Sequence, residues 1–240
     1  GPGNPDSIDL DAAISYTTDQ IVQQQWTNLI YYLHYAQANT PTAIIPIDII
    51  AFSRGAAIAL HFANQIIAHT NKGLFSYTDR YGDQVKACIQ PRFMGLLDNV
   101  AQMGILGAKN HLYDFSVSPA WQWVVHGVAM HESRYLFPLY SIGSANNSLE
   151  TGFIGAHGDL GGGYPIENEP NTKPLSDVAL EWILWNARAQ GMQFNHIDLK
   201  QGNYAYMHDE SLGIMGDRLV ENYPFPFTSD RDLRNKQTLH

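Results

Sequence analysis

Residues 47–57 read Ile-Asp-Ile-Ile-Ala-Phe-Ser-Arg-Gly-Ala-Ala, and the hydrophobic pattern changes its period inside this stretch. The apolar, β-branched run over residues 43–52 is typical of a strand buried on both faces of a parallel sheet. A predicted helix from Gly55 to about His69 follows at once. Ser53 therefore stands on a tight turn between a strand and a helix.

A strand, a tight turn and a helix around a serine predict a nucleophile elbow, in which the serine hydroxyl is exposed at the top of the turn. Such a turn brings backbones close together, which favours the small residues found at Ala51 and Gly55. The backbone N–H of Arg54 opens the helix, and we expect this positive helix end to stabilise an oxyanion. The local match is short, and the alternative is a serine that N-caps an ordinary helix.

The remaining pattern predicts strands that alternate with flanking helices, which is the α/β fold class. Helical spacing covers residues 7–38 and 175–190, and predicted strands cover residues 84–95, 123–129 and 152–156. We expect residues 1–240 to form one domain with an irregular tail over residues 196–240. No strand is predicted before residue 43, which favours a mostly parallel sheet that lacks its N-terminal strands.

Composition excludes several classes of protein. The 14 Lys and Arg residues against 23 Asp and Glu residues give a formal charge of −9, which disfavours nucleic acid as a partner. No apolar stretch approaches the roughly 20 residues that span a bilayer, so we expect a soluble chain without a transmembrane segment. The single cysteine, Cys88, excludes an internal disulfide, and we expect it to be buried in a strand.

A nucleophilic serine needs a histidine that accepts its proton. His157 is the predicted base, because it follows a short apolar segment in Phe-Ile-Gly-Ala-His-Gly-Asp-Leu-Gly-Gly-Gly-Tyr, residues 153–164. Small residues on either side of it allow a tight loop and close approach of a substrate. The alternative is a loop histidine beside glycines 161–163, whose backbone N–H groups would cradle an anion.

The imidazole in turn needs a carboxylate, and this fold places it between the serine and the histidine in the chain. Asp98 closes the predicted strand in Arg-Phe-Met-Gly-Leu-Leu-Asp-Asn-Val, residues 92–100, and has that order. A helix N-cap or a turn aspartate is the alternative for Asp98.

Other histidines carry weaker signals. His126, His131 and Glu132 lack the spacing of a helical zinc motif, so we expect buried structural residues rather than a metal site. His208, in Tyr-Met-His-Asp-Glu-Ser, is a reserve candidate for a substrate-side or catalytic role, with a solvated loop as the alternative.

Four ordered segments resemble the type VI secretion lipase effectors of the Tle class, α/β-hydrolases in the branch whose nucleophile segment reads Gly-Phe-Ser-Arg-Gly-Ala. Here that segment reads Ala-Phe-Ser-Arg-Gly-Ala over residues 51–56. Residues 93–100 resemble the family's Phe-x-Gly-x-x-Asp-Thr-Val, and residues 126–134 its His-Ala-Val-Ala-x-Asp-Glu-Arg-Arg. Residues 157–164 resemble its His-x-Asp-Val-Gly-Gly-Gly-Tyr.

The resemblance implies a Ser53, Asp98 and His157 triad that hydrolyses ester bonds of membrane phospholipids without a cofactor or metal. It implies an antibacterial effector that acts in the periplasm of a target bacterium and contacts the membrane surface transiently. Secretion-apparatus proteins and an immunity protein are the implied partners. Substrate or oxyanion contacts are expected from Arg54, Asp159 and His208, and from Gly3 if residues 1–3 stand in for the family's opening Phe-Asp-Gly-Thr loop.

Three departures separate this chain from the family: Ala51 in place of the elbow glycine, Asn99 in place of threonine, and the missing opening strand. They keep two other functions open. One is a soluble carboxylesterase that acts on small esters. The other is a non-catalytic binding module that kept the hydrolase fold but lost part of the site.

Overall fold

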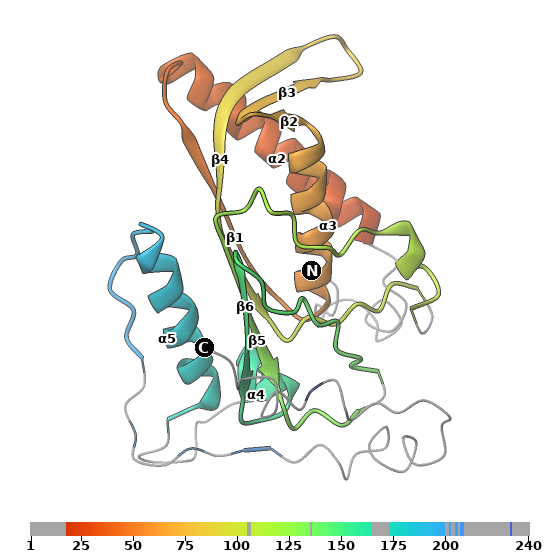
Figure 1. Cartoon of the computed structure of the whole chain (residues 1–240), viewed down its shortest axis with the longest axis vertical. Helices are drawn as coiled ribbons and strands as arrows, with labels where there is room; N and C mark the ends of the chain where they lie inside the picture. Colours follow the sequence, from red (N-terminus) through yellow and green to blue (C-terminus); the bar gives the residue numbers. More distant parts are fainter. Residues whose placement is uncertain are drawn as a thin grey trace.

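The computed structural model describes residues 18–104, 107–134, 136–164, 173–199, 202, 205, 207, 208 and 231. The helices are α2 (Thr18–Asn39), α3 (Arg54–Ala68), α4 (His157–Gly161) and α5 (Leu175–Ala189), with a short 3-10 helix, η2 (Asn110–Leu112). The strands are β1 (Ile45–Phe52), β2 (Thr70–Asn71), β3 (Leu74–Thr78), β4 (Gln84–Leu97), β5 (Trp123–Ala129) and β6 (Ser148–Phe153). Helices flank a mixed, mostly parallel sheet, which confirms the predicted α/β-hydrolase-like fold class (Figure 1).

The parallel part of the sheet has the strand order β1-β4-β5-β6. The register aligns the ends of these strands, because Phe52 lies opposite Leu97 and Leu97 lies opposite Gly127. The carboxyl ends of the parallel strands therefore meet at one edge of the sheet. In open α/β sheets that edge is where ligands bind.

Strand β4 is long and takes part in two kinds of pairing. Its first residues pair antiparallel with β3, which itself pairs with β2, and this hairpin stands at the top of Figure 1. Side chains alternate along a strand, so Val85 and Ala87 are buried whereas Lys86 and Cys88 are exposed. The expectation of a buried Cys88 was wrong, because the residue lies on the open face of the hairpin.

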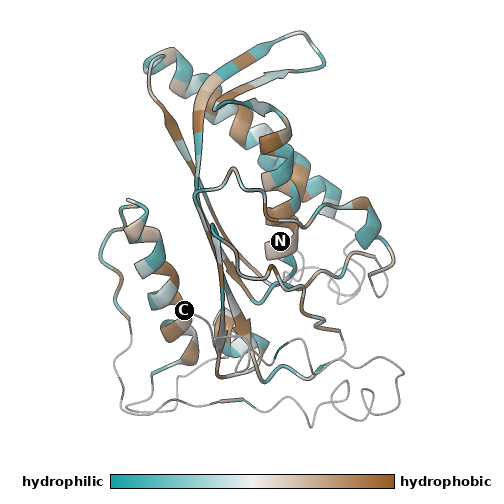
Figure 2. Cartoon of the chain, viewed as in Figure 1, coloured by the Kyte–Doolittle hydropathy of each residue, from teal (hydrophilic) through white to brown (hydrophobic). Residues whose placement is uncertain are grey.

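Helices cover both faces of the parallel sheet (Figure 1). On one face, α2 and α3 pack through apolar side chains such as Leu33, Leu60 and Ile66, and on the other α5 packs Ile183 against Phe93. The apolar residues concentrate along the strands and the facing sides of the helices (Figure 2). Burial of these side chains stabilises the layers by about 1.5–3 kcal/mol for each large residue.

Most predicted elements appear close to their expected bounds. The predicted strand at residues 152–156 is an exception, because β6 runs over Ser148–Phe153 and residues 154–156 form the loop into α4. The sequence did not predict the start of this strand because Ser148 and Glu150 are polar, and yet both side chains are buried. Residues 7–17 of the predicted first helix and most of the tail over residues 196–240 lie outside the described residues. Among the helices described, none has the length and apolar character needed to cross a bilayer.

Candidate active site

Ser53 occupies a strained turn between β1 and α3. Its backbone has φ 61° and ψ −135°, a conformation that residues other than glycine rarely adopt. The turn is held from both sides: the Ser53 N–H donates to the Leu97 carbonyl at 2.9 Å, and the Ser53 carbonyl accepts from Val100 at 3.2 Å. Strain of this kind persists only where surrounding hydrogen bonds enforce it, and it is the geometry of a nucleophile elbow.

Asp98 directly follows β4, the strand beside β1. Its backbone is also left-handed, with φ 39°, and its N–H donates to the Gly127 carbonyl of β5 at 2.7 Å. The Asp98 side chain is fully buried, and its Oδ1 accepts the N–H of Ala129 at 2.9 Å. The turn after β4 thus points a carboxylate along the end of the sheet.

His157 is the first residue of α4 and connects the other two side chains. Its Nδ1 lies 2.6 Å from Asp98 Oδ2, and its Nε2 lies 2.7 Å from Ser53 Oγ. An ionised carboxylate can only accept, so Nδ1 carries the proton and Nε2 is left to accept from the serine hydroxyl. The structure therefore brings the three residues of the predicted triad into one hydrogen-bonded series.

The imidazole of His157 is also held by packing. The ring of Phe52 stacks on it with a centroid distance of 4.4 Å, and the ring of Phe137 lies 4.7 Å away. Aromatic contacts of this geometry contribute about 0.5–1.5 kcal/mol each beyond area burial. They fix the imidazole plane between Asp98 and Ser53.

Crowding in the elbow occurs at Gly161 and not at Gly55. A Cβ on Gly55 would meet nothing within 4 Å, whereas a Cβ on Gly161 would lie 2.1 Å from the Phe52 ring. The steric reason that the sequence suggested for a small residue at Gly55 does not hold here. The tight approach is instead between α4 and the residue before the serine.

Replacing Gly161 with alanine is expected to displace Phe52 from His157. We expect a loss of about 1–3 kcal/mol of stability, the usual cost of overpacking, together with a lower rate of ester hydrolysis. Thermal denaturation and turnover of a short ester measure the two effects. Gly55→Ala is the control for stability and should leave the melting temperature unchanged; equal melting temperatures for the two variants would contradict the crowding at Gly161.

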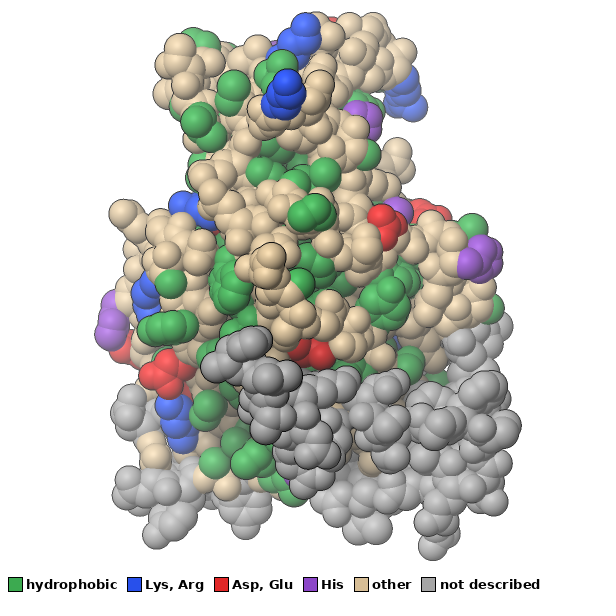
Figure 3. Space-filling model, viewed as in Figure 1, with side chains coloured by type: hydrophobic (Ala, Val, Ile, Leu, Met, Phe, Trp, Pro, Cys, Tyr) green, Lys and Arg blue, Asp and Glu red, His purple; other side chains and the backbone are tan. Residues whose placement is uncertain are grey.

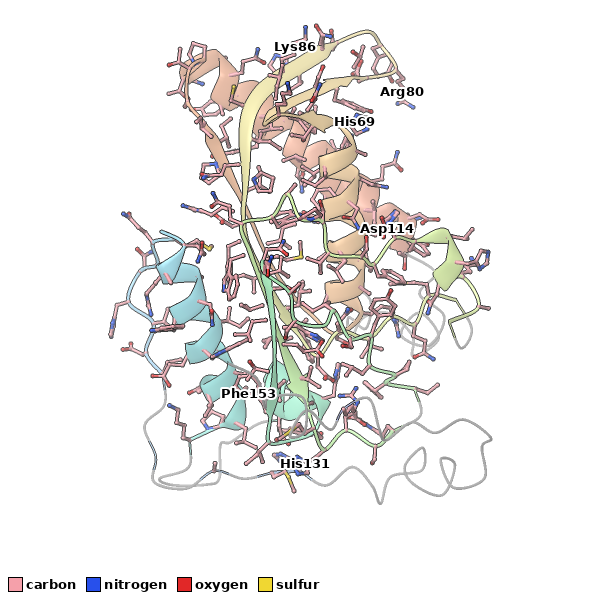
Figure 4. All side chains as sticks on the ribbon, in the orientation of Figure 1. His69, Arg80, Lys86, Asp114, His131 and Phe153 are labelled. Carbon is pink, nitrogen blue, oxygen red and sulfur yellow. The ribbon has the colours of Figure 1, made fainter. Side chains whose placement is uncertain are left out.

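The segment after β5 supports the loop that carries His157. The N–H of Gly155 donates to His131 Nδ1 at 3.1 Å, and His131 N–H donates back to the Gly155 carbonyl at 3.1 Å. Figure 4 shows His131 at the same end of the molecule as Phe153, the last residue of β6. Glu132 accepts the His157 N–H at 3.1 Å and is itself paired with Arg134 at 2.6 Å. Glu132 is buried, as expected, whereas His131 is exposed, because it lies in the turn after β5 and holds the loop before His157 from outside; the expectation of a buried His131 was wrong.

A second buried network supports the turn at Asp98. The N–H of Asn99 donates to His126 Nε2 at 2.9 Å, so the proton of this fully buried imidazole lies on Nδ1, which donates to Glu150 at 2.9 Å. Glu150 also accepts from the Ser141 hydroxyl at 2.7 Å. His126 and Glu150 therefore hold the residue that follows the buried carboxylate.

This network makes stability depend on pH. Burial alone would raise the pKa of Glu150, but its hydrogen bonds, first that from His126 and then those from Ser141 and the Ile142 N–H, lower that pKa below the ordinary value of 4.5. A carboxyl whose pKa is depressed in the folded state contributes stability above its unfolded pKa and loses it as the pH falls through the folded pKa. We expect the melting temperature to fall steeply below about pH 4.5, where the unfolded chain binds more protons.

Glu150→Gln should lower the melting temperature at neutral pH and flatten this acid dependence. Glu181→Gln is the matched control, because Glu181 pairs with Lys173 at the surface with its side chain 58% exposed. A Glu150→Gln profile that superimposes on that of the control would contradict the role of the buried pair.

The remaining predicted site residues fall into two groups. Arg54 is the first residue of α3, so its backbone N–H lies at the positive end of the helix, next to Ser53. Asp159 is buried and accepts from the N–H of Ala156, and from both the N–H and the ring of His208, at 2.7–3.0 Å. The His208 ring stacks on Tyr164 with centroids 3.7 Å apart. Gly3 lies outside the described residues, and substrate contacts for the others stay predictions.

Comparison with known proteins gives a family match over the part of the chain that holds two of the three side chains. Residues 69–186 match the profile of the phospholipase effector Tle1-like catalytic domain of the type VI secretion system. This segment includes Asp98 and His157, and Ser53 precedes it. No curated protein sequence matches the chain.

Two solved structures are similar. An uncharacterized protein from Pseudomonas aeruginosa is 24% identical, with a TM-score of 0.47, over 68% of this chain and 26% of that chain. The Tle1 effector bound to the VgrG spike of the type 6 secretion system is 30% identical, with a TM-score of 0.40, over 53% of this chain and 26% of that chain. The present chain thus spans about a quarter of each. The match over residues 69–186 thus confirms the similarity to the type VI secretion phospholipase effector family that the sequence motifs indicated.

Proposed function

We propose that this chain is a serine esterase that hydrolyses ester bonds of membrane phospholipids. One observation carries the proposal: His157 makes short hydrogen bonds to Ser53 on one ring nitrogen and to Asp98 on the other. A strained serine, a neutral imidazole and a buried carboxylate in series are the parts that acyl transfer requires. The match of residues 69–186 to the Tle1-like phospholipase catalytic domain supports phospholipid as the substrate class.

In the proposed mechanism, Ser53 Oγ attacks the ester carbonyl while His157 Nε2 takes its proton. Asp98 stabilises the imidazolium through the Nδ1 proton, and the Arg54 N–H at the start of α3 donates to the oxyanion. His157 then protonates the leaving alcohol. Water hydrolyses the acyl-enzyme, with His157 again as the base.

We propose, from the family, that the protein is delivered by the type VI secretion apparatus into the periplasm of a target bacterium and that an immunity protein guards the producing cell. Transient contact with a lipid surface follows from the substrate. Among the described residues on the face shown in Figure 3, charged side chains are scattered and form no broad basic patch.

The test compares two substrates at matched ester concentration: vesicles of phosphatidylethanolamine and phosphatidylglycerol, and a short-chain ester that stays monomeric. Mass spectrometry of released fatty acid measures the first, and absorbance the second. Faster turnover of the vesicle lipid supports a phospholipase. Equal or faster turnover of the monomeric ester favours a carboxylesterase, and no turnover of either favours a binding module.

A further inference from the structure

The carboxylate of Asp98 has a second charged partner that lies 133 positions away in the chain, Arg231. Arg231 Nη1 donates to Asp98 Oδ1 at 2.7 Å and to the Ala129 carbonyl at 2.7 Å. Its Nη2 donates to the Phe137 carbonyl at 2.7 Å. One guanidinium therefore joins the turn after β4, the end of β5 and the loop that carries Phe137.

Arg231 is almost fully buried, with 5% of its surface exposed. Arginine and aspartate are rarely buried unless they are paired, because removing a charge from water is costly. The three hydrogen bonds and the ion pair offset that cost only in this one geometry. A solvent-exposed arginine would not need these hydrogen bonds, because water would solvate its charge.

The two carboxylate oxygens of Asp98 accept hydrogen bonds from different donors. Oδ1 accepts from Arg231 and from the Ala129 N–H, whereas Oδ2 accepts from His157. With Oδ1 held by two donors, the carboxylate cannot turn about its axis without losing both. Oδ2 is thereby kept toward the imidazole.

The Arg231 guanidinium also supports His157 through Phe137. It holds the carbonyl of Phe137, and the Phe137 ring packs on the imidazole at 4.7 Å. The Arg134 guanidinium also packs on the Phe137 ring, 4.0 Å from its centre. Both supports of His157, the carboxylate and the aromatic wall, thus share one anchor.

We propose that Arg231 is a positioning residue of the hydrolase site, which fixes the Asp98 carboxylate and the Phe137 wall so that His157 stays aligned between Asp98 and Ser53. The inference rests on the proposed esterase function. Arg231 acts through Asp98 and Phe137 and is assigned no contact with the substrate.

The charge of Arg231 also affects the pKa of Asp98, which a purely packing role would leave unchanged. Burial opposes ionisation of Asp98, but the charge of Arg231, followed by the hydrogen bond from His157, holds the pKa of Asp98 well below its usual range. Among the described residues, Glu132 and its partner Arg134 are further charged groups beside His157, because Glu132 accepts the His157 N–H. Without the guanidinium, Asp98 should protonate at a higher pH and cease to support the imidazolium there.

The test uses the whole chain with three substitutions at this position: Arg231→Met, Arg231→Gln and Arg231→Lys. Arg80→Met is the control, because Arg80 is exposed and lies at the opposite end of the molecule from His131 (Figure 4). We expect Arg231→Met to lower the kcat for a short ester by about 100-fold, the scale of a small misplacement in an active site, with little change in KM. The acid limb of its pH–rate profile should move to higher pH, and Arg231→Lys should restore part of both.

A second measurement is independent of turnover. The Nδ1 proton of His157 shared with Asp98 should give a low-field NMR signal that is shifted or lost in Arg231→Met and unchanged in Arg80→Met. If the wild-type chain hydrolyses no ester, the proposed function fails and this signal alone decides the role of Arg231. A folded Arg231→Met variant with wild-type kcat, acid limb and NMR signal would overturn the proposal. Should that variant not fold, wild-type kcat in both Arg231→Lys and Arg231→Gln would overturn it equally.

Discussion

Ser53→Ala is expected to reduce the kcat for ester hydrolysis by roughly 10⁶-fold, the scale seen when one member of a serine triad is removed. The reason is chemical, since alanine has no oxygen to attack the carbonyl and His157 then has no proton to accept. The turn itself should survive, because Leu97 and Val100 hold it through backbone groups. The melting temperature should therefore change little, and a stopped assay with excess enzyme measures the residual rate.

Labelling with a fluorophosphonate probe, followed by peptide mapping, gives an independent measure of the same residue. The wild-type chain should be labelled at Ser53, and both Ser53→Ala and His157→Ala should lose the adduct. Ser76→Ala, on β3 in the distant hairpin, is the matched control and should label as the wild type does. Full esterase activity in Ser53→Ala would remove the basis of the proposed mechanism.

Asp98→Asn should have the second largest effect, a fall in kcat of about 10⁴-fold. An amide can donate to the imidazole, so it permits the tautomer in which Nδ1 accepts and Nε2 carries the proton. In that tautomer His157 cannot take the proton of Ser53 Oγ. Steady-state kinetics on a short ester measures the loss, with kcat affected more than KM.

The same substitution should destabilise the fold by about 3–5 kcal/mol, because it leaves the buried charge of Arg231 without a counter-charge. Denaturant unfolding measures this cost. Asp48→Asn is the matched control: it removes the partner of Arg92 at a site where both side chains keep some exposure, 16% and 19%, and should cost only about 1 kcal/mol. Equal costs for the two variants would show that Arg231 does not depend on Asp98 for compensation.

Local sequence was enough to predict the strand before Ser53, the helix after it and the turn between them. A fully apolar run and a 3.6-residue period are properties of neighbouring residues, and the order of the serine, the carboxylate and the histidine can be read directly along the chain. Once the strands are parallel and adjacent, their carboxyl ends must share one edge. Ser53 and Asp98, each directly after its strand, then fall beside each other.

Contacts between distant residues could not be read in this way. The hairpin of β2 and β3 has strands of two and five residues, too short to show a period. Glu150 was hidden because a buried carboxylate is stable only when partners such as His126 are present, and those partners come from other strands. Sequence patterns record the environment of a residue only through its neighbours in the chain.

The position of Arg231 could not be predicted from the sequence. In the sequence it is one arginine in an aperiodic segment, and nothing nearby distinguishes it from a solvated side chain. Its burial and its three hydrogen bonds, one of them to Asp98, exist only after β4, β5 and the loop that carries Phe137 have come together. The order of the catalytic elements is thus a local property of this chain, whereas the side chains that hold them in position come from tertiary packing, because desolvated charge is stable only where the whole fold supplies its partners.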